Sequence, residues 1–131
     1  MPSAETLERF IARVEQNAHA EAIEEFYAEH GAIRENQSLP RVGRAALVDG
    51  ERRTLARVRS MQSTCVRPVL VSDDTVVLRW IFEFNWLDGT TTRMEELAYQ
   101  RWEEEKIAEE QFFYDPAQRR PVARPLEQNS R

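Results

Sequence analysis

The sequence feature that most constrains the fold is a run of alternating apolar and polar residues over 75–102, interrupted once by Asp88-Gly89. The run is rich in β-branched and aromatic residues, which are typical of strands, and Asp-Gly is a strong signal for a two-residue hairpin turn. We therefore predict antiparallel strands over 75–87 and 91–102, with further strands over 61–71 and 106–114. Pro68 cannot donate a ladder hydrogen bond, so it predicts a bulge or an edge position in the first of these strands.

A two-residue turn would place Leu87 opposite Thr90, and this register sorts the hairpin side chains into two faces. One face is strongly apolar and holds Leu78, Trp80, Phe82, Phe84, Trp86, Leu97 and Tyr99. The other face is mixed and holds Arg79, Ile81, Glu83, Asn85, Met94, Glu96, Ala98, Gln100 and Trp102. An antiparallel sheet usually buries its apolar face on helices, but three short helices cover so long a sheet poorly. In the alternative arrangement, the aromatic face meets a second copy of the chain and the mixed face lines a cavity. A slip of one residue would invert these assignments.

Apolar stripes with helical spacing precede the strands. The first stripe follows Ser3, a good helix-capping residue, and consists of Leu7, Phe10, Ile11, Val14 and Ala18. A second helix is predicted over 20–30, where Gly31 ends the pattern, and a third over 44–58. Residues 32–36 predict a brief strand, so the chain is expected to be an α+β domain.

Length and composition are those of one ordinary globular domain. The chain has 131 residues, of which 41% are hydrophobic and 31% charged. After residue 115 prolines and arginines prevail and apolar residues are few, so we predict a single domain over 1–115 and a flexible tail over 116–131. No apolar run is long enough for a membrane span, and the first residues lack the features of a signal peptide, which predicts a cytoplasmic location without membrane contact.

The charge and the few metal-binding side chains exclude several classes of partner. A formal net charge of -5 argues against nucleic acid as a partner. Cys65 is the only cysteine, so no internal disulfide can form. His19 and His30 stand alone without ligand-like spacing, and we expect neither a metal nor another cofactor.

Two segments resemble a known family. The run from Glu96 to Trp102, followed by Lys106-Ile107 and by residues 110–116, resembles the last hairpin of SnoaL-like proteins. Residues 27–35 are similar to the second helix and first short strand of the same family. SnoaL-like polyketide cyclases and ketosteroid isomerases belong to the nuclear transport factor 2-like superfamily. The resemblance covers nearly all of the chain except the tail.

This resemblance implies a cone-shaped domain in which about three helices pack on a strongly curved, mainly antiparallel sheet that encloses a pocket. It also implies a homodimer formed through the outer face of the sheet, which favours the second arrangement of the two faces. The expected dimer interface then consists of Trp80, Phe82, Phe84 and Trp86. The expected pocket lining consists of Arg79, Glu83, Glu96 and Gln100.

Candidate catalytic residues follow from the same resemblance. Ketosteroid isomerases have a carboxylate base at the position of Glu35, but the two positions of their oxyanion donors are Phe10 and Ala98 here. Because neither residue can donate a hydrogen bond to an enolate, steroid isomerase activity is not expected. SnoaL-like cyclases use a carboxylate near the end of the sheet, without metal or cofactor, and Glu110 and Asp115 are nearest to that place.

The turn before the last strand decides between these two carboxylates. A three-residue turn places Glu110 and Tyr114 on the same face as Gln100, whereas a two-residue turn selects Asp115. We prefer the first register. A glutamic acid in a partly apolar cavity has a raised pKa, which suits proton transfer near neutral pH. Glu35 and Glu110 are thus the predicted catalytic residues, and the predicted ligand-binding residues are Arg79, Glu83, Glu96, Gln100, Tyr114 and Asp115.

Three functions remain open from the sequence. The first is a cofactor-free enzyme that performs acid–base chemistry on an apolar carbonyl compound. The second is a non-catalytic module that binds an apolar or carbonyl-bearing ligand, with the carboxylates in a buried hydrogen-bonded network. The third is a dimeric interaction domain whose aromatic sheet face is the functional surface.

Overall fold

The computed structural model describes residues 1–123, which form three helices, seven strands and one short 3-10 helix. The helices are α1 (Ala4–Glu15), α2 (His19–Phe26) and α3 (Arg44–Leu55), and the 3-10 helix is η1 (Pro116–Arg119). The strands are β1 (Tyr27–Glu35), β2 (Arg41–Val42), β3 (Val58–Ser72), β4 (Thr75–Trp86), β5 (Thr90–Glu103), β6 (Lys106–Phe113) and β7 (Val122–Ala123). The predicted α+β class is confirmed.

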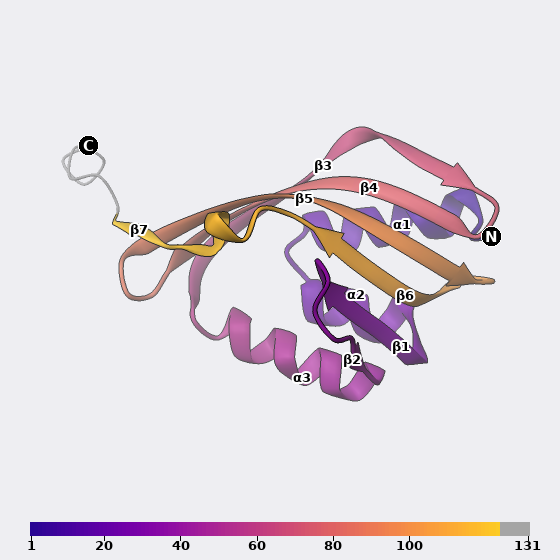
Figure 1. Ribbon diagram of the computed structural model, residues 1–131, viewed down its shortest axis with the longest axis horizontal. Helices are drawn as coiled ribbons and strands as arrows, with labels where there is room; N and C mark the ends of the chain where they lie inside the picture. Colours follow the sequence, from indigo (N-terminus) through magenta and orange to yellow (C-terminus); the bar gives the residue numbers. More distant parts are fainter. Residues whose placement is uncertain (124–131) are drawn as a thin grey trace.

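The strands form one open, curved sheet in the order β2-β1-β6-β5-β4-β3, with β7 paired to β5. All neighbours are antiparallel except β1 and β6, which are parallel. Figure 1 shows the long strands β3, β4 and β5 arching over the helices, which all lie on the concave side. Pro68 lies in the edge strand β3, where the pairing register shifts between Val66 and Leu70, as predicted.

The register of the β4–β5 hairpin differs from the prediction by one residue. Trp80 lies opposite Glu96 and Asn85 lies opposite Thr91, so Leu87 belongs to the turn. The Asp88 carboxylate accepts hydrogen bonds from the backbone N–H and the hydroxyl of Thr90, and Gly89 has a φ of 88°. These features make a three-residue loop whose last residue needs the left-handed conformation that glycine adopts without strain.

The shifted register changes which side chains lie inside. The even-numbered residues of both strands now share the concave face, so Trp80 and Phe82 are buried and cannot form an outer dimer interface. Phe84 and Trp86 lie on the same concave face. The predicted dimer interface through these four side chains is therefore wrong.

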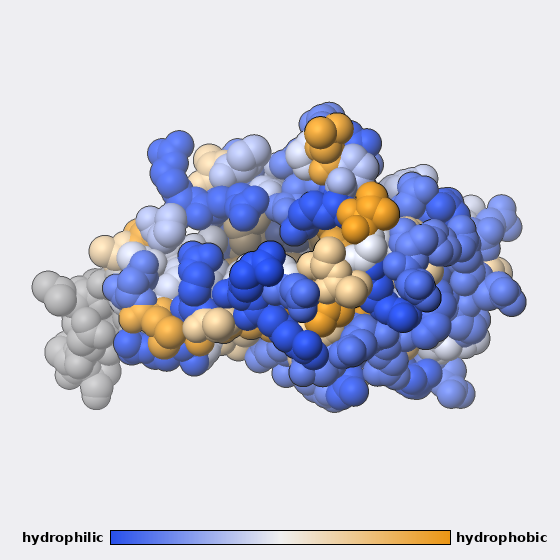
Figure 2. Space-filling view, turned by 90° about the horizontal axis from the view of Figure 1, so that it is seen from below, coloured by the Kyte–Doolittle hydropathy of each residue, from blue (hydrophilic) through white to orange (hydrophobic). Residues whose placement is uncertain are grey.

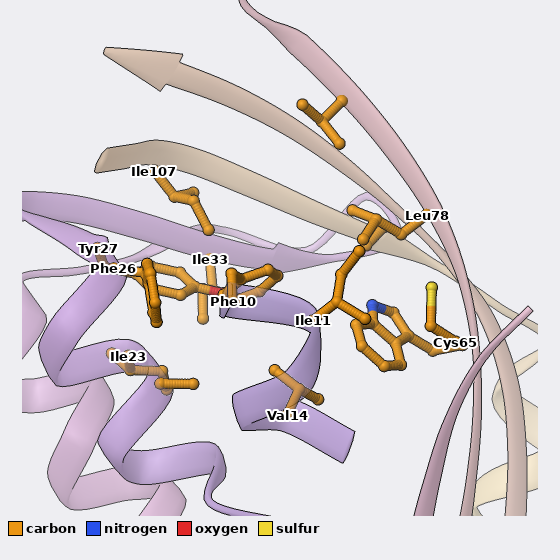
Figure 3. Close-up of a cluster of buried hydrophobic side chains, with 14 of the residues drawn as sticks. Phe10, Ile11, Val14, Ile23, Phe26, Tyr27, Ile33, Cys65, Leu78 and Ile107 are labelled. Carbon is orange, nitrogen blue, oxygen red and sulfur yellow. The ribbon is translucent and has the colours of Figure 1, made fainter. Parts of the chain in front are cut away.

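The core lies between α1, α2 and the concave face. Ser3 caps α1, because its hydroxyl oxygen accepts a hydrogen bond from the backbone N–H of Thr6 at 3.0 Å. Figure 3 shows Phe10 and Ile11 of α1 between Leu78 of the sheet and the side chains around Phe26. Burial of each large apolar side chain of this kind contributes about 1.5–3 kcal/mol to stability. Leu7, Phe10, Ile11 and Val14 of the predicted apolar stripe are buried in α1 as predicted, whereas Ala18 lies beyond the helix.

The second helix is shorter than predicted. It ends at Phe26, and Tyr27 already pairs with Ile107 of β6 at the start of β1. Gly31 lies in β1, where the register shifts, and an added Cβ would be 2.9 Å from the carbonyl oxygen of Ala28. Gly31 therefore permits a close backbone approach inside a strand. In the sequence, such a glycine cannot be distinguished from one that ends a helix.

The segment predicted as a flexible tail begins with two elements that pack on the sheet. β6 pairs with β5 only from Leu97 onward, which leaves the edge of β5 over 90–96 open. β7 pairs with β5 at Thr90 and Thr91, and the Gln118 side chain accepts from the backbone N–H of Glu95 at 2.6 Å and donates to its carbonyl at 3.3 Å. Residues 124–131 of the predicted tail lie outside the described residues.

None of the helices in residues 1–123 combines the length and the apolar content that crossing a membrane would require.

Candidate active site

A cavity of about 340 Å³ lies between the concave face of the sheet and the helices. Its lining combines aromatic residues of β4, apolar residues of α1 and α2, and a set of charged side chains from several elements. Figure 2 shows a hollow near the middle of the face seen from below, bordered by hydrophilic and hydrophobic residues. The volume is in the range of small-molecule pockets.

The sheet wall of the cavity is aromatic. Trp80, Phe82, Phe84 and Trp86 follow one another at every second position of β4 and all line the cavity. The rings of Trp80 and Phe82 stack at 5.4 Å and those of Phe84 and Trp86 at 4.9 Å, and the indole N–H of Trp86 donates to the Thr92 hydroxyl at 2.8 Å. This strip offers a flat apolar surface to a ligand.

Glu110 is the buried carboxyl of the cavity, with 3% of the residue exposed. The Tyr27 hydroxyl donates to one of its oxygens, and the Gln100 amide donates to the other at 2.7 Å. The indole N–H of Trp102 donates to the Gln100 carbonyl oxygen at 2.9 Å, which fixes the orientation of the amide. Glu110 is thus held in place by a fully paired buried network.

The environment of Glu110 shifts its acidity to neutral pH. Burial raises the pKa of Glu110 to about 7, although the hydrogen bonds from Tyr27 and Gln100 act in the opposite direction. Burial also holds the pKa of Tyr27 well above its ordinary value, with the nearby Glu110 carboxyl as a second cause. Tyr27 therefore remains a hydrogen-bond donor while Glu110 gains or loses its proton.

Glu96 is a second carboxyl of the cavity with altered acidity. Burial raises the pKa of Glu96 to about 8, the negative charges of Glu110 and Glu35 add to this effect, and Arg119 opposes it. The pKa values of both carboxyls are therefore raised to near neutral pH. Two carboxyl groups that exchange protons near neutral pH within one cavity can serve as base and acid.

Glu35 lines the cavity but is held in an ion-pair cluster. Its carboxylate accepts hydrogen bonds from the Tyr114 hydroxyl, from Arg119 at 3.0 Å and from Arg41 at 3.0 Å. Arg119 also donates to the Tyr114 oxygen at 3.1 Å. Because three donors already occupy the carboxylate, this geometry favours a structural role for Glu35 and Tyr114 over proton transfer.

Five of the predicted pocket residues do not line the cavity. Gln100 and Tyr114 lie behind the lining and donate hydrogen bonds to Glu110 and Glu35, and the other three lie elsewhere. Arg79 and Glu83 lie on the convex face as a consequence of the one-residue shift in register, and Arg79 forms an ion pair with Glu95 at 3.4 Å. Asp115 caps η1, where its carboxylate accepts from the backbone N–H of Ala117 at 2.9 Å. The placement of Arg79, Glu83 and Asp115 in the pocket is therefore wrong.

The structure also brings residues into the cavity that the sequence did not indicate. In the sequence, Tyr27 resembles an apolar position of the second helix, and Glu51 resembles a solvent-exposed position of the third. His19 and Arg119 come from segments far apart in sequence, and only the fold brings both into the cavity lining. Among residues 1–123, no group of three histidine, cysteine or acidic side chains is placed to hold a metal ion.

A curved sheet with helices over its concave face and a pocket between the two layers defines the nuclear transport factor 2-like class of domains. Residues 7–110 match the model of the SnoaL-like domain family, and the chain belongs to this family. No curated protein matches the sequence.

Solved structures of the same fold come from several bacteria. A Catenulispora acidiphila protein with a ketosteroid isomerase-like fold, in complex with trimethylamine, has 16% identity and a TM-score of 0.73, with 88% of this chain and 89% of that chain covered. A Mesorhizobium loti protein named as a SnoaL-like polyketide cyclase has 24% identity and a TM-score of 0.70, with 85% and 97% covered. An epoxide hydrolase from M. tuberculosis has 11% identity and a TM-score of 0.71, with 87% and 83% covered. At these identities, the likeness shows a shared fold.

Proposed function

We propose that this domain is an enzyme that performs acid–base chemistry on an apolar carbonyl compound, with its own carboxyl groups as the proton carriers. The observation that carries the proposal is the placement of the Glu110 and Glu96 carboxyls in one cavity, where burial raises their pKa values to about 7 and about 8. The aromatic strip of β4 supplies a surface for the apolar part of the ligand.

The proposed step is proton abstraction next to the carbonyl group. The ionised Glu110 carboxylate takes a proton from the carbon beside the carbonyl, and the electron pair of that C–H bond forms a C=C bond. The protonated Glu96 donates its proton to the carbonyl oxygen, so the product is a neutral enol and the negative charge moves from Glu110 to Glu96. The reverse transfer returns both protons. Glu96 would thus supply a donor that the residues at positions 10 and 98 cannot.

Proteins of this fold named as a polyketide cyclase and as an epoxide hydrolase support the choice of an enzyme. The Catenulispora acidiphila protein of the same fold is in complex with trimethylamine, which supports a small molecule as the ligand. The class of ligand proposed for this chain is inferred from the residues of its own cavity and not from the ligands of these neighbours.

Hydrogen–deuterium exchange at carbon tests the proposal without knowledge of the natural substrate. Aromatic ketones such as 2-tetralone and acetophenone would be incubated with the protein in D₂O, and loss of the α-proton signal would be followed by ¹H NMR. We expect faster exchange with the wild-type protein than in buffer. In Glu110→Gln and in Glu96→Gln the rate should be lower than in wild type by a factor of about 10².

Glu109→Gln is the matched control, because Glu109 is the neighbour of Glu110 on the exposed face of β6 and pairs with Arg101. An unchanged rate in Glu110→Gln would contradict the proposal. If wild-type protein binds these ketones in saturation-transfer NMR but exchanges none, the domain is a binding module.

We also propose a homodimer through the convex face of the sheet, with residues other than those inferred from the sequence. Leu97, Tyr99 and Phe113 lie on this face and are 47%, 50% and 37% exposed. Leu97 and Phe113 are paired across β5 and β6, so they form one apolar area. A second copy of the chain would cover it.

Analytical ultracentrifugation of Leu97→Asp tests this interface. We expect a dimer for wild type and a folded monomer for the variant. Leu87→Asp is the control, since Leu87 is exposed in the hairpin loop away from the paired strands. A monomeric wild type at micromolar concentration would contradict the proposal.

A further inference from the structure

A series of hydrogen bonds reaches the cavity at His19. His19 is the first residue of α2, lines the cavity and has a side chain that is 11% exposed. Its Nε2 lies 2.8 Å from the hydroxyl of Ser63, which is itself 2.8 Å from the Asn17 Oδ1. The Asn17 Nδ2 lies 3.0 Å from the backbone carbonyl oxygen of Met61.

The donor and acceptor of each hydrogen bond in this series can be assigned by starting from the backbone carbonyl of Met61. A backbone carbonyl can only accept, so the Asn17 amide nitrogen donates to Met61 and its Oδ1 is turned to Ser63. An amide oxygen can only accept, so the single proton of the Ser63 hydroxyl goes to Asn17. The Ser63 oxygen must then accept from His19, which requires a proton on Nε2.

Nδ1 is therefore the nitrogen of His19 that is able to gain or lose a proton. It makes no hydrogen bond within the part of the chain that the structure describes, and it lies 3.4 Å from a carboxylate oxygen of Glu51 on α3. Glu51 also lines the cavity. A carboxylate at this distance can act as the counter-ion of a protonated His19 without occupying the Nδ1 proton in a short hydrogen bond.

The surroundings connect this pair with the proposed site. The His19 ring packs edge-on against Phe82 of the aromatic strip, with 5.2 Å between the ring centroids. The charged groups that face the same part of the cavity are Glu51 from α3 and Glu110 from β6. Both His19 and Glu51 act on the Glu110 carboxyl, since the positive charge lowers its pKa and the negative charge raises it.

We propose that His19 is a further acid–base residue of this pocket and that Nδ1 is its working atom. Resting on the proposed function above, the imidazolium donates its Nδ1 proton to a hydroxyl or carbonyl oxygen on the helix side of the ligand, with Glu51 as the counter-ion. The imidazole becomes neutral, the ligand oxygen gains the proton, and the reverse transfer restores both. The ligand thus carries two oxygen groups, one toward Glu96 and one toward His19. Ser63 and Asn17 are positioning residues.

The first test uses the exchange assay on His19→Ala with a ketone that carries a second oxygen group, such as 6-hydroxy-2-tetralone. We expect a rate about 10²-fold lower than in wild type, with partial recovery on addition of imidazole, which a purely structural role of His19 would not give. His30→Ala is the control, because His30 is the only other histidine and is exposed beside Glu103. An unchanged rate in His19→Ala overturns the inference while the proposed function stands. A wild type without any exchange overturns both.

The second test needs no substrate. In protein labelled with ¹⁵N, the chemical shifts and couplings of neutral His19 are expected to show a proton on Nε2 and a bare Nδ1. Ser63→Ala removes the acceptor of the Nε2 proton and should give a mixture of the two neutral tautomers. A proton on Nδ1 and a bare Nε2 in neutral His19 of wild type would overturn the inference.

Discussion

At the scale of single residues, the acidity of Glu110 has a measurable effect on stability. Its pKa is about 7 in the folded protein and ordinarily 4.5, so the unfolded chain releases this proton at lower pH. The contribution of Glu110 is complete below about pH 4.5 and is lost as the pH rises through 7. The total loss is about 3 kcal/mol, because each unit of pKa corresponds to about 1.4 kcal/mol.

Glu110→Gln has no such titration. We expect the free energy of unfolding of wild type, relative to this variant, to fall by about 3 kcal/mol between pH 4.5 and pH 7.5. Urea unfolding at several pH values measures the difference. Glu109→Gln should show no comparable change relative to wild type, since Glu109 is exposed. A pH-independent difference for Glu110→Gln would mean that the folded state does not disfavour its ionised form.

Gln100 is the residue on which the buried network depends. It is fully buried and joins the Trp102 indole to the Glu110 carboxyl. Gln100→Leu keeps the volume but leaves the Trp102 indole N–H and one oxygen of Glu110 without a partner, at a cost of about 2–4 kcal/mol in the free energy of unfolding. It should also raise the pKa of Glu110 further, because a hydrogen bond to the ionised form is lost. Gln62→Leu, at an exposed position of β3, is the control in urea unfolding, and equal stability of the two variants would contradict the prediction.

At the scale of elements, periodicity predicts the first helix and the four long strands because each must bury one apolar side. The predicted hairpin register was wrong because the register depends on the number of residues in the loop. Asp88-Gly89 is compatible with both a two-residue and a three-residue loop, and only the Asx hydrogen bonds to Thr90 distinguish them. One residue of shift moved Arg79 and Glu83 to the convex face and the tryptophans of β4 to the concave face.

The structure of residues 116–123 also depends on contacts with residues that are distant in sequence. No local pattern of residues 116–123 predicts structure, because the open edge of β5 over 90–96 is a consequence of the short β6. The Gln118 side chain forms hydrogen bonds there with the backbone N–H and carbonyl of Glu95, which a neighbouring strand would otherwise form. Only a tertiary arrangement supplies that partner.

Gln118→Ala should therefore release the backbone N–H of Glu95 to solvent. We expect its amide to exchange about tenfold faster, which corresponds to a local loss of about 1.4 kcal/mol. Hydrogen exchange followed by NMR measures this amide directly, and Arg120→Ala is the control at the end of η1. An unchanged Glu95 amide would mean that the η1 segment does not protect the edge of β5.

At the scale of the whole molecule, the pocket exists because the two layers of the domain enclose it together. The helices bury the concave face, so Glu96 and Glu110 titrate in a medium much less polar than water. The sequence identified both carboxyls and Gln100 through their common face, and this grouping survived because the even positions of β5 face inward in either register. It could not identify His19, Glu51 or Tyr27, whose partners come from other elements.

The raised pKa values of Glu110 and Glu96, with Glu110 as the base and Glu96 as the acid, predict a bell-shaped pH profile for the ketone exchange reaction. The rate should rise as Glu110 ionises at a pKa of about 7 and fall as Glu96 loses its proton at a pKa of about 8. Because the ionised Glu110 contributes to the raised pKa of Glu96, the two limbs report the pair and not two independent groups. In Glu96→Gln the alkaline limb should disappear while the acid limb near pH 7 remains, at a lower maximum rate. A bell-shaped profile with an unchanged alkaline limb in this variant would assign that limb to another residue and remove Glu96 as the acid.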